Sequence, residues 1–128
     1  MIGNWSSQAD NLCESFSKIS GRQIIVSDRD TIVAGSSGVK REVLDKLVND
    51  EISDIINSRK KYAKTADDKE IPITEYGKHI AGSVHPVISR GDILGSVILV
   101  ADAGDAPSEA DLRMAAMIAD FLADQSGN

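Results

Sequence analysis

The chain has a single cysteine, Cys13, among its 128 residues, so it cannot form an internal disulfide. That scarcity suits a reducing compartment. The sequence also has no stretch near the roughly 18 consecutive apolar residues that a membrane-spanning helix needs. Its N-terminus lacks the basic and apolar regions of a signal peptide. We therefore expect a soluble, cytoplasmic protein that has no membrane partner.

The sequence is also poor in positively charged residues. Lysine and arginine number 14 against 20 aspartate and glutamate residues, which gives a formal net charge of −6 at pH 7. An acidic surface repels phosphate, so direct binding of nucleic acid is disfavoured. Hydrophobic residues make up 41% of the chain, enough for the core of one ordinary domain. We therefore expect a single domain that spans residues 1–128.

The most informative segment is the apolar run Val97-Ile98-Leu99-Val100. It has no polar face to present to water, so both faces of this strand are expected to be covered. Residues 86–101 as a whole are typical of a hairpin that leads into the run. The run is therefore predicted to be the central strand of a sheet.

Helical patterns occupy both ends of the chain. Ser7 and Asp10 match a capping box, and an apolar helix face recurs behind them up to Gly21. Ser108 and Asp111 open the last helix in the same way. Two further helices are predicted in the middle of the chain, one over residues 39–48 and a short one that begins at residues 49–50.

The strands come in hairpins rather than alternating with helices. Two β-branched runs at residues 23–26 and 31–34 predict one hairpin. Further strands are expected near residues 71–73 and 79–88, while residues 58–70 are a polar surface loop. Hairpin connections favour antiparallel pairing. The predicted fold is α+β, with a GAF/PAS-like antiparallel sheet of about five strands and helices at both chain ends.

The last helix carries two apolar stripes, one through Leu112 and Ala119 and the other through Met114 and Phe121. A helix that is apolar on two sides must be covered on two sides. One side can lie on the sheet. The other is expected to meet the first helix or another subunit.

Several segments, in their order and spacing, resemble one family. They are Ser27–Asp30, Ser36–Gly38 with Lys40 and Arg41, Pro86–Ile88, Gly91–Ile93 with Gly95, Val97 and Ile98, and the closing stretches Ser108–Asp111 and Ala119–Ala123. These segments resemble the C-terminal domain of the stage V sporulation protein T (SpoVT) family. The resemblance covers nearly the whole chain, from about Asn4 onward.

The resemblance implies a regulatory GAF domain of a transcription regulator from endospore-forming bacteria. In that family an AbrB-type DNA-binding domain precedes the GAF domain. No such segment is recognised here, so DNA contact is expected only through that missing N-terminal domain.

The resemblance also implies a homodimer or higher homo-oligomer that forms through the terminal helices. The residues expected at this interface are Trp5, Leu12, Phe16, Leu112, Ala115, Ile118, Phe121 and Leu122. Trp5 directly precedes an amphipathic helix, so packing within one chain is an alternative role for it.

A small-molecule effector is a candidate partner, in a pocket on one face of the sheet roofed by the middle helices and residues 58–70. The candidate ligand-binding residues are Asp28, Arg29, Ser36, Ser37, Tyr62 and His85. For Asp28 the alternative is a hydrogen bond to nearby backbone amides in a turn. For Ser36 and Ser37, ahead of a helix, it is a helix cap. The basic segment 59–64 is expected to be a solvated loop, with a contact to the DNA-binding half as an alternative.

No metal or cofactor site is predicted. On one strand, His79 and His85 would lie roughly 20 Å apart, and Cys13 is far from both in sequence, so no zinc pattern emerges. The chain is not expected to be an enzyme. Two alternatives to the sensory function stay open: a purely structural dimerisation module without a ligand, and a small hydrolase that uses a serine and a histidine. The sequence has no G-x-S-x-G motif to support the hydrolase.

Overall fold

The computed structural model describes residues 2–102 and 104–126. Its elements are, in order, α1 (Ile2–Ser20), β1 (Ile24–Ser27), β2 (Ile32–Gly35), α2 (Ser37–Val43), α3 (Asp50–Ser58), β3 (Tyr62–Ala63), β4 (Ala81–Ser89), β5 (Asp92–Val100) and α4 (Glu109–Ser126). The strands form a five-stranded sheet in the order β2-β1-β5-β4-β3, and every neighbouring pair is antiparallel. The predicted fold class is confirmed.

The apolar run that the sequence singles out lies at the centre of this sheet. β5 pairs with β1 on one side and with β4 on the other. Val97, Ile98 and Leu99 are completely buried. The prediction of a central strand with both faces covered is therefore confirmed.

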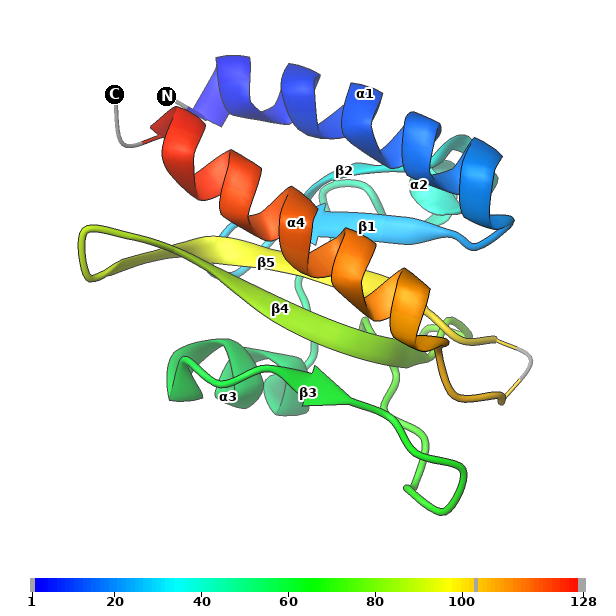
Figure 1. The fold of residues 1–128 in the computed structure, drawn as a ribbon. Helices are drawn as coiled ribbons and strands as arrows, with labels where there is room; N and C mark the ends of the chain where they lie inside the picture. The colour runs from blue at the N-terminus through cyan, green and yellow to red at the C-terminus, as the bar shows by residue number, and fades with distance from the viewer. Residues whose placement is uncertain (1, 103, 127–128) are drawn as a thin grey trace.

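Helices cover both faces of the sheet (Figure 1). Val97 and Leu99 of β5 point into a core shared with α1 and α4. The intervening Ile98 joins a second core under α2 and α3. This alternation follows from the two-residue period of a strand. The protein is thus a three-layer sandwich, with the terminal helices on one face and the middle helices on the other.

The first helix begins earlier than its capping pattern predicts. It starts at Ile2, so Ser7 lies inside the helix and does not cap it. The carboxylate of Asp10 instead accepts hydrogen bonds from Lys40 Nζ at 2.7 Å and from the Gly35 backbone N–H at 3.2 Å. Trp5 is buried in the core, and this burial favours the additional helical turn.

The first middle helix is shorter than predicted. It ends at Val43, where Leu44 takes a non-helical ψ of 135° and Asp45 a left-handed φ of 68°. Leu47 lies outside it and forms a backbone bridge to Thr31. The second helix begins where the sequence predicts, with the Asn49 side chain accepting a hydrogen bond from the Ile52 N–H at 3.0 Å.

The edge of the sheet also differs from expectation. The predicted loop at residues 58–70 contains β3, which pairs with Val84 and Ser83 of β4. The predicted strand near Pro72 is reduced to a single bridge with Ile80. The last helix follows Ser108, whose Oγ accepts a hydrogen bond from the Asp111 N–H at 3.1 Å, as predicted. Over the described residues, none of the helices is long and apolar enough to cross a membrane.

Candidate functional site

The predicted ligand residues lie in three separate places. Asp28 and Arg29 occupy the turn between β1 and β2. Asp28 Oδ1 accepts hydrogen bonds from the backbone N–H groups of Asp30 at 2.9 Å and Thr31 at 2.7 Å. The Arg29 guanidinium donates to Asn57 Oδ1 at 3.3 Å. The two hydrogen bonds that Asp28 accepts stabilise the turn, which is the role that Asp commonly has at such positions.

Ser36 and Ser37 lie at the opposite end of the same hairpin. Ser36 is completely buried; its hydroxyl donates to Gln23 Oε1 at 2.7 Å and accepts from the Ile24 N–H at 3.0 Å. The Ser37 N–H donates to the carboxylate of Glu14. Both serines therefore tie the start of α2 to neighbouring elements.

Tyr62 and His85 are the two predicted ligand residues that share a cavity wall. Both line a recess of about 190 Å³ at the β3 edge of the sheet. Tyr62 also packs against the core under α3, and within the described part of the chain its buried hydroxyl has no hydrogen-bond partner. The space under the middle helices, where the sequence places the pocket, is filled by buried side chains such as Ile25, Ile32 and Ile98.

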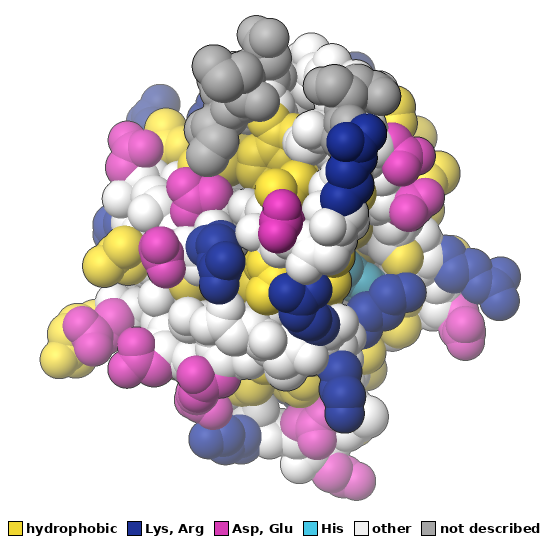
Figure 2. Space-filling view, turned by 90° about the vertical axis from the view of Figure 1, so that its left-hand side faces the viewer, with side chains coloured by type: hydrophobic (Ala, Val, Ile, Leu, Met, Phe, Trp, Pro, Cys, Tyr) yellow, Lys and Arg dark blue, Asp and Glu magenta, His cyan; other side chains and the backbone are white. Residues whose placement is uncertain are grey.

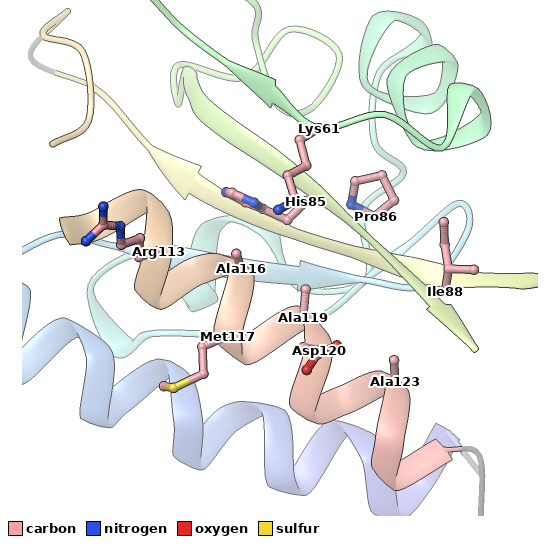
Figure 3. Close-up of a pocket in the computed structure, with 10 residues that line it drawn as sticks. All are labelled: Lys61, His85, Pro86, Ile88, Arg113, Ala116, Met117, Ala119, Asp120 and Ala123. Atoms are coloured by element: carbon pink, nitrogen blue, oxygen red, sulfur yellow. The ribbon is translucent and has the colours of Figure 1, made fainter. Parts of the chain in front are cut away.

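A larger groove of about 500 Å³ continues from this recess between β4 and α4 (Figure 3). Its walls come from the segment before β3, from β4 and from α4. The residues that line it are Lys61, His85, Pro86, Ile88, Arg113, Ala116, Met117, Ala119, Asp120 and Ala123. The groove is thus on the α4 face of the sheet and not on the predicted side.

The groove is electrostatically uneven along its length. Lys61, His85 and Arg113 gather at the end that also borders the recess. Asp120 lies seven residues further along α4, about 10 Å away at the helical rise of 1.5 Å per residue. Alanine side chains separate the two ends. Figure 2 shows charged and apolar side chains interspersed on one face, with Lys and Arg side chains beside the visible histidine.

His85 is the most unusual side chain of the groove. It is only 3% exposed, and its Nε2 lies 2.8 Å from the Ser83 hydroxyl. Its Nδ1 is buried with no hydrogen-bond partner among the described residues. Burial, together with the charge of Lys61, lowers the pKa of His85 to about 4. The ring is therefore neutral at pH 7 and one of its nitrogens is unsatisfied.

The contact between Ser83 and His85 brings together the residue types of a hydrolytic pair. A nucleophilic serine needs access to substrate, but Ser83 is completely buried. A catalytic histidine also needs a third group on its other nitrogen, and His85 Nδ1 has none within the described part of the chain. A histidine with a pKa of about 4 is moreover a weak base at pH 7. The pair is best explained as a buried structural contact.

His79 belongs to a different cluster. It precedes β4, and its ring nitrogens lie 2.5 Å from Asp102 Oδ2 and 2.9 Å from Glu42 Oε1. Burial alone would lower the pKa of His79, but the hydrogen bonds with Asp102 and Glu42 outweigh it and raise the pKa. The ring thereby links α2 to the segment after β5.

The remaining candidates for chemistry are buried or paired. Cys13 is completely inaccessible, and burial, reinforced by Asp10 and Glu14, raises the pKa of its thiol to about 12. A nucleophilic thiolate is therefore not available at neutral pH. Across residues 2–102 and 104–126, no three His, Cys, Asp or Glu side chains are grouped as a metal site would need.

The predicted interface residues divide into two groups. Trp5, Phe16, Ala115, Ile118 and Leu122 are at most 5% exposed within one chain, where they form the core between the terminal helices and the sheet. Trp5 Nε1 donates to the Leu122 carbonyl at 3.2 Å. Leu12 and Leu112 are partly buried. Phe121 is 42% exposed, and so is available to a partner.

Of the groove residues, the sequence interpretation includes His85 among the ligand candidates and misses the charged residues Lys61, Arg113 and Asp120. Arg113, Met117 and Asp120 recur at steps of four and three and share one face of α4. Such a mixed polar and apolar stripe is a signal for a groove-facing helix. Lys61 carries no comparable signal, since the sequence alone does not show that it meets α4.

Similar solved structures share the fold at low identity. A type II free methionine-R-sulfoxide reductase from Thermoplasma acidophilum has a TM-score of 0.72 at 17% identity, covering 96% of this chain and 92% of that one. The cofactor-binding GAF domain of the nutrient sensor CodY from Clostridium difficile has a TM-score of 0.65 at 14% identity, covering 91% and 83%. The GAF domain of an Acinetobacter phosphoenolpyruvate-protein phosphotransferase has a TM-score of 0.69 at 12% identity, covering 94% and 80%.

A search of curated proteins finds no match. A family model described as stage V sporulation protein T C-terminal, transcription factor, matches residues 4–126. This match agrees with the resemblance found in the sequence and with the GAF domains among the similar structures. The chain therefore belongs to the stage V sporulation protein T C-terminal family of transcription factors, and its fold is that of a GAF domain.

Proposed function

We propose that this GAF domain is the regulatory domain of a SpoVT-type transcription factor and that it controls self-association through α4. In this proposal an effector binds in the groove between β4 and α4, and a second copy of the chain packs on the outer side of the same helix. DNA contact is assigned to a separate AbrB-type domain, consistent with the net charge of −6. The protein acts in the cytoplasm and is not a catalyst.

The observation that carries this proposal is the position of Met117. It lines the groove, yet it is 60% exposed. Phe121 is one helical turn further along and is also exposed. A ligand that moves Met117 would therefore change the surface offered to the partner. Only a ligand with different affinities for the two association states would shift their populations.

A structural module without an effector is the alternative. It is favoured by the α2 and α3 side of the sheet, where buried isoleucine and valine side chains fill the space. In that case self-association would persist, but no small molecule would change it. The unsatisfied Nδ1 of His85 beside the groove favours the sensory proposal.

The test is sedimentation velocity of the whole chain over a range of concentrations. Phe121→Glu places a charge on the proposed interface, and we expect it to weaken self-association by about tenfold or more. Leu47→Glu is the matched control, because Leu47 is 66% exposed but lies between α2 and α3. A wild-type chain that stays monomeric at high concentration would contradict the proposal, as would equal effects of the two substitutions.

A further inference from the structure

We infer that the groove between β4 and α4 is a binding site for a small organic monoanion with an apolar body, such as an aliphatic monocarboxylate. The inference rests on the proposed function, since it names the chemical class of the effector. It follows from three features of the groove: a cationic end, an acidic end and an apolar middle.

The cationic end provides groups that a carboxylate can accept hydrogen bonds from. Lys61 and Arg113 flank His85 there. A neutral histidine has one N–H. We place it on Nδ1, with the Ser83 hydroxyl donating to Nε2 across 2.8 Å. The buried Nδ1–H then has no hydrogen-bond partner among the described residues. An anion in the groove would be attracted by both neighbouring cations. It would satisfy this donor once a small movement of the ring exposes Nδ1, which solvent does not reach in the structure.

The acidic end limits the ligand to one negative charge. Asp120 lines the groove about 10 Å along α4 from Arg113. A second carboxylate at the far end of a ligand would meet this like charge, which is unfavourable. The groove therefore discriminates by total charge and by where on the ligand that charge is carried.

The middle of the groove suits an aliphatic chain. Ala116 and Ala119 line the groove from α4, and Pro86 and Ile88 line it from β4. These side chains offer no hydrogen bonds, so contact with them favours methylene groups. A volume of about 500 Å³ lies within the range of small-molecule sites.

The experiment compares six-carbon probes by calorimetry and NMR on the whole chain. Hexanoate is the monoanion, adipate has a second carboxylate at the far end, and hexylamine carries the opposite charge. We expect hexanoate to bind about tenfold more tightly than adipate, and hexylamine not to bind at the His85 end. Equal affinity of hexanoate and adipate, or saturable binding of none of the three, would overturn the inference.

Variants locate the site. Arg113→Gln should weaken hexanoate by about tenfold, while Arg41→Gln, an exposed arginine on α2, should have no effect. Asp120→Asn should bring adipate close to hexanoate in affinity. Hexanoate binding that is indifferent to Arg113→Gln would place the ligand elsewhere and overturn the assignment.

A spectroscopic readout separates a ligand contact from a structural effect. Nitrogen NMR of His85 should show the proton on Nδ1. Hexanoate should raise the pKa of this ring, because the anion offsets the charge of Lys61; the other charged groups of the groove are Arg113 and Asp120. A proton on Nε2 in the bound state would overturn the proposed contact. Hexanoate binding without any change in self-association would uphold this site and contradict the proposed function. Self-association with no binding of any probe would overturn this site and uphold only the α4 interface of the proposed function.

Discussion

At the scale of single residues, the two histidines respond to different charges. His79 lies between the carboxylates of Asp102 and Glu42, so its protonated form is favoured. His85 is buried and lies near Lys61, and its ring hydrogen-bonds with the Ser83 hydroxyl, so its neutral form is favoured. The sequence alone does not predict this difference between the two histidines, because the charged groups near each of them are distant along the chain. The same residue type thus supports the fold at one site and lines a groove at the other.

The raised pKa of His79 makes one contribution to stability depend on pH. The folded-state pKa lies above the ordinary value of 6.5, so the stabilisation is fully present below about pH 6.5 and is lost as the pH rises through the folded pKa. We expect His79→Gln to destabilise the protein at pH 6, with a smaller difference at pH 9. Urea denaturation of both proteins at several pH values measures this difference.

His85→Gln is the contrasting control. The pKa of His85 is lowered to about 4, so its contribution is present above about pH 6.5 and is lost as the pH falls through the folded pKa. The difference from wild type should therefore change with pH in the opposite direction. Equal pH dependence of the two variants would contradict this account.

At the scale of elements, local patterns predict helix starts only where nothing distant competes. Ser108 and Asn49 begin helices as predicted, because their cap contacts are made within three residues. Ser7 does not, because burial of Trp5 extends α1. Helix α2 ends earlier than predicted, just before the left-handed Asp45. No residue type at this point of the sequence predicts that end. Tertiary packing therefore overrides local preference in the latter two cases.

Asn49 offers a direct test of one helix start. Its side chain accepts from the Ile52 N–H at 3.0 Å and also donates to the Pro72 carbonyl. Asn49→Ala removes both contacts and should lower the free energy of unfolding by about 1–2 kcal/mol. Asn49→Asp keeps the cap but loses the donor, so it should be less harmful. Chemical denaturation measures both, and a more harmful Asp variant would contradict the assignment.

At the scale of the whole molecule, the sequence predicts the fold better than the site. The apolar run at residues 97–100 is enough to place the central strand, because a strand with only apolar side chains must be buried on both faces. The groove requires Lys61 and Arg113 to meet, and they are 52 positions apart in the chain. Of the predicted ligand residues, Tyr62 and His85 border the same space. Long-range packing decides which surface charges become neighbours.

The proposed coupling through α4 has a thermodynamic consequence for the whole assembly. If hexanoate changes the association constant by some factor, association must change the affinity for hexanoate by the same factor per site. We expect the dissociation constant of hexanoate to differ between dilute and concentrated protein. Phe121→Glu should remove this dependence on protein concentration while hexanoate still binds. Calorimetry at two protein concentrations measures the dissociation constant of hexanoate. Identical dissociation constants at the two concentrations would contradict coupling.

The shortness of β3 has a further consequence. It pairs with Val84 and Ser83 alone, which leaves the later part of β4 as an uncovered edge beside the groove. Exposed strand edges invite another chain to add a strand, a route to fibrils. Pro86 lies on this stretch and has no N–H to offer an incoming strand. We therefore expect Pro86 to disfavour the addition of a strand at this edge, beside the groove that it lines.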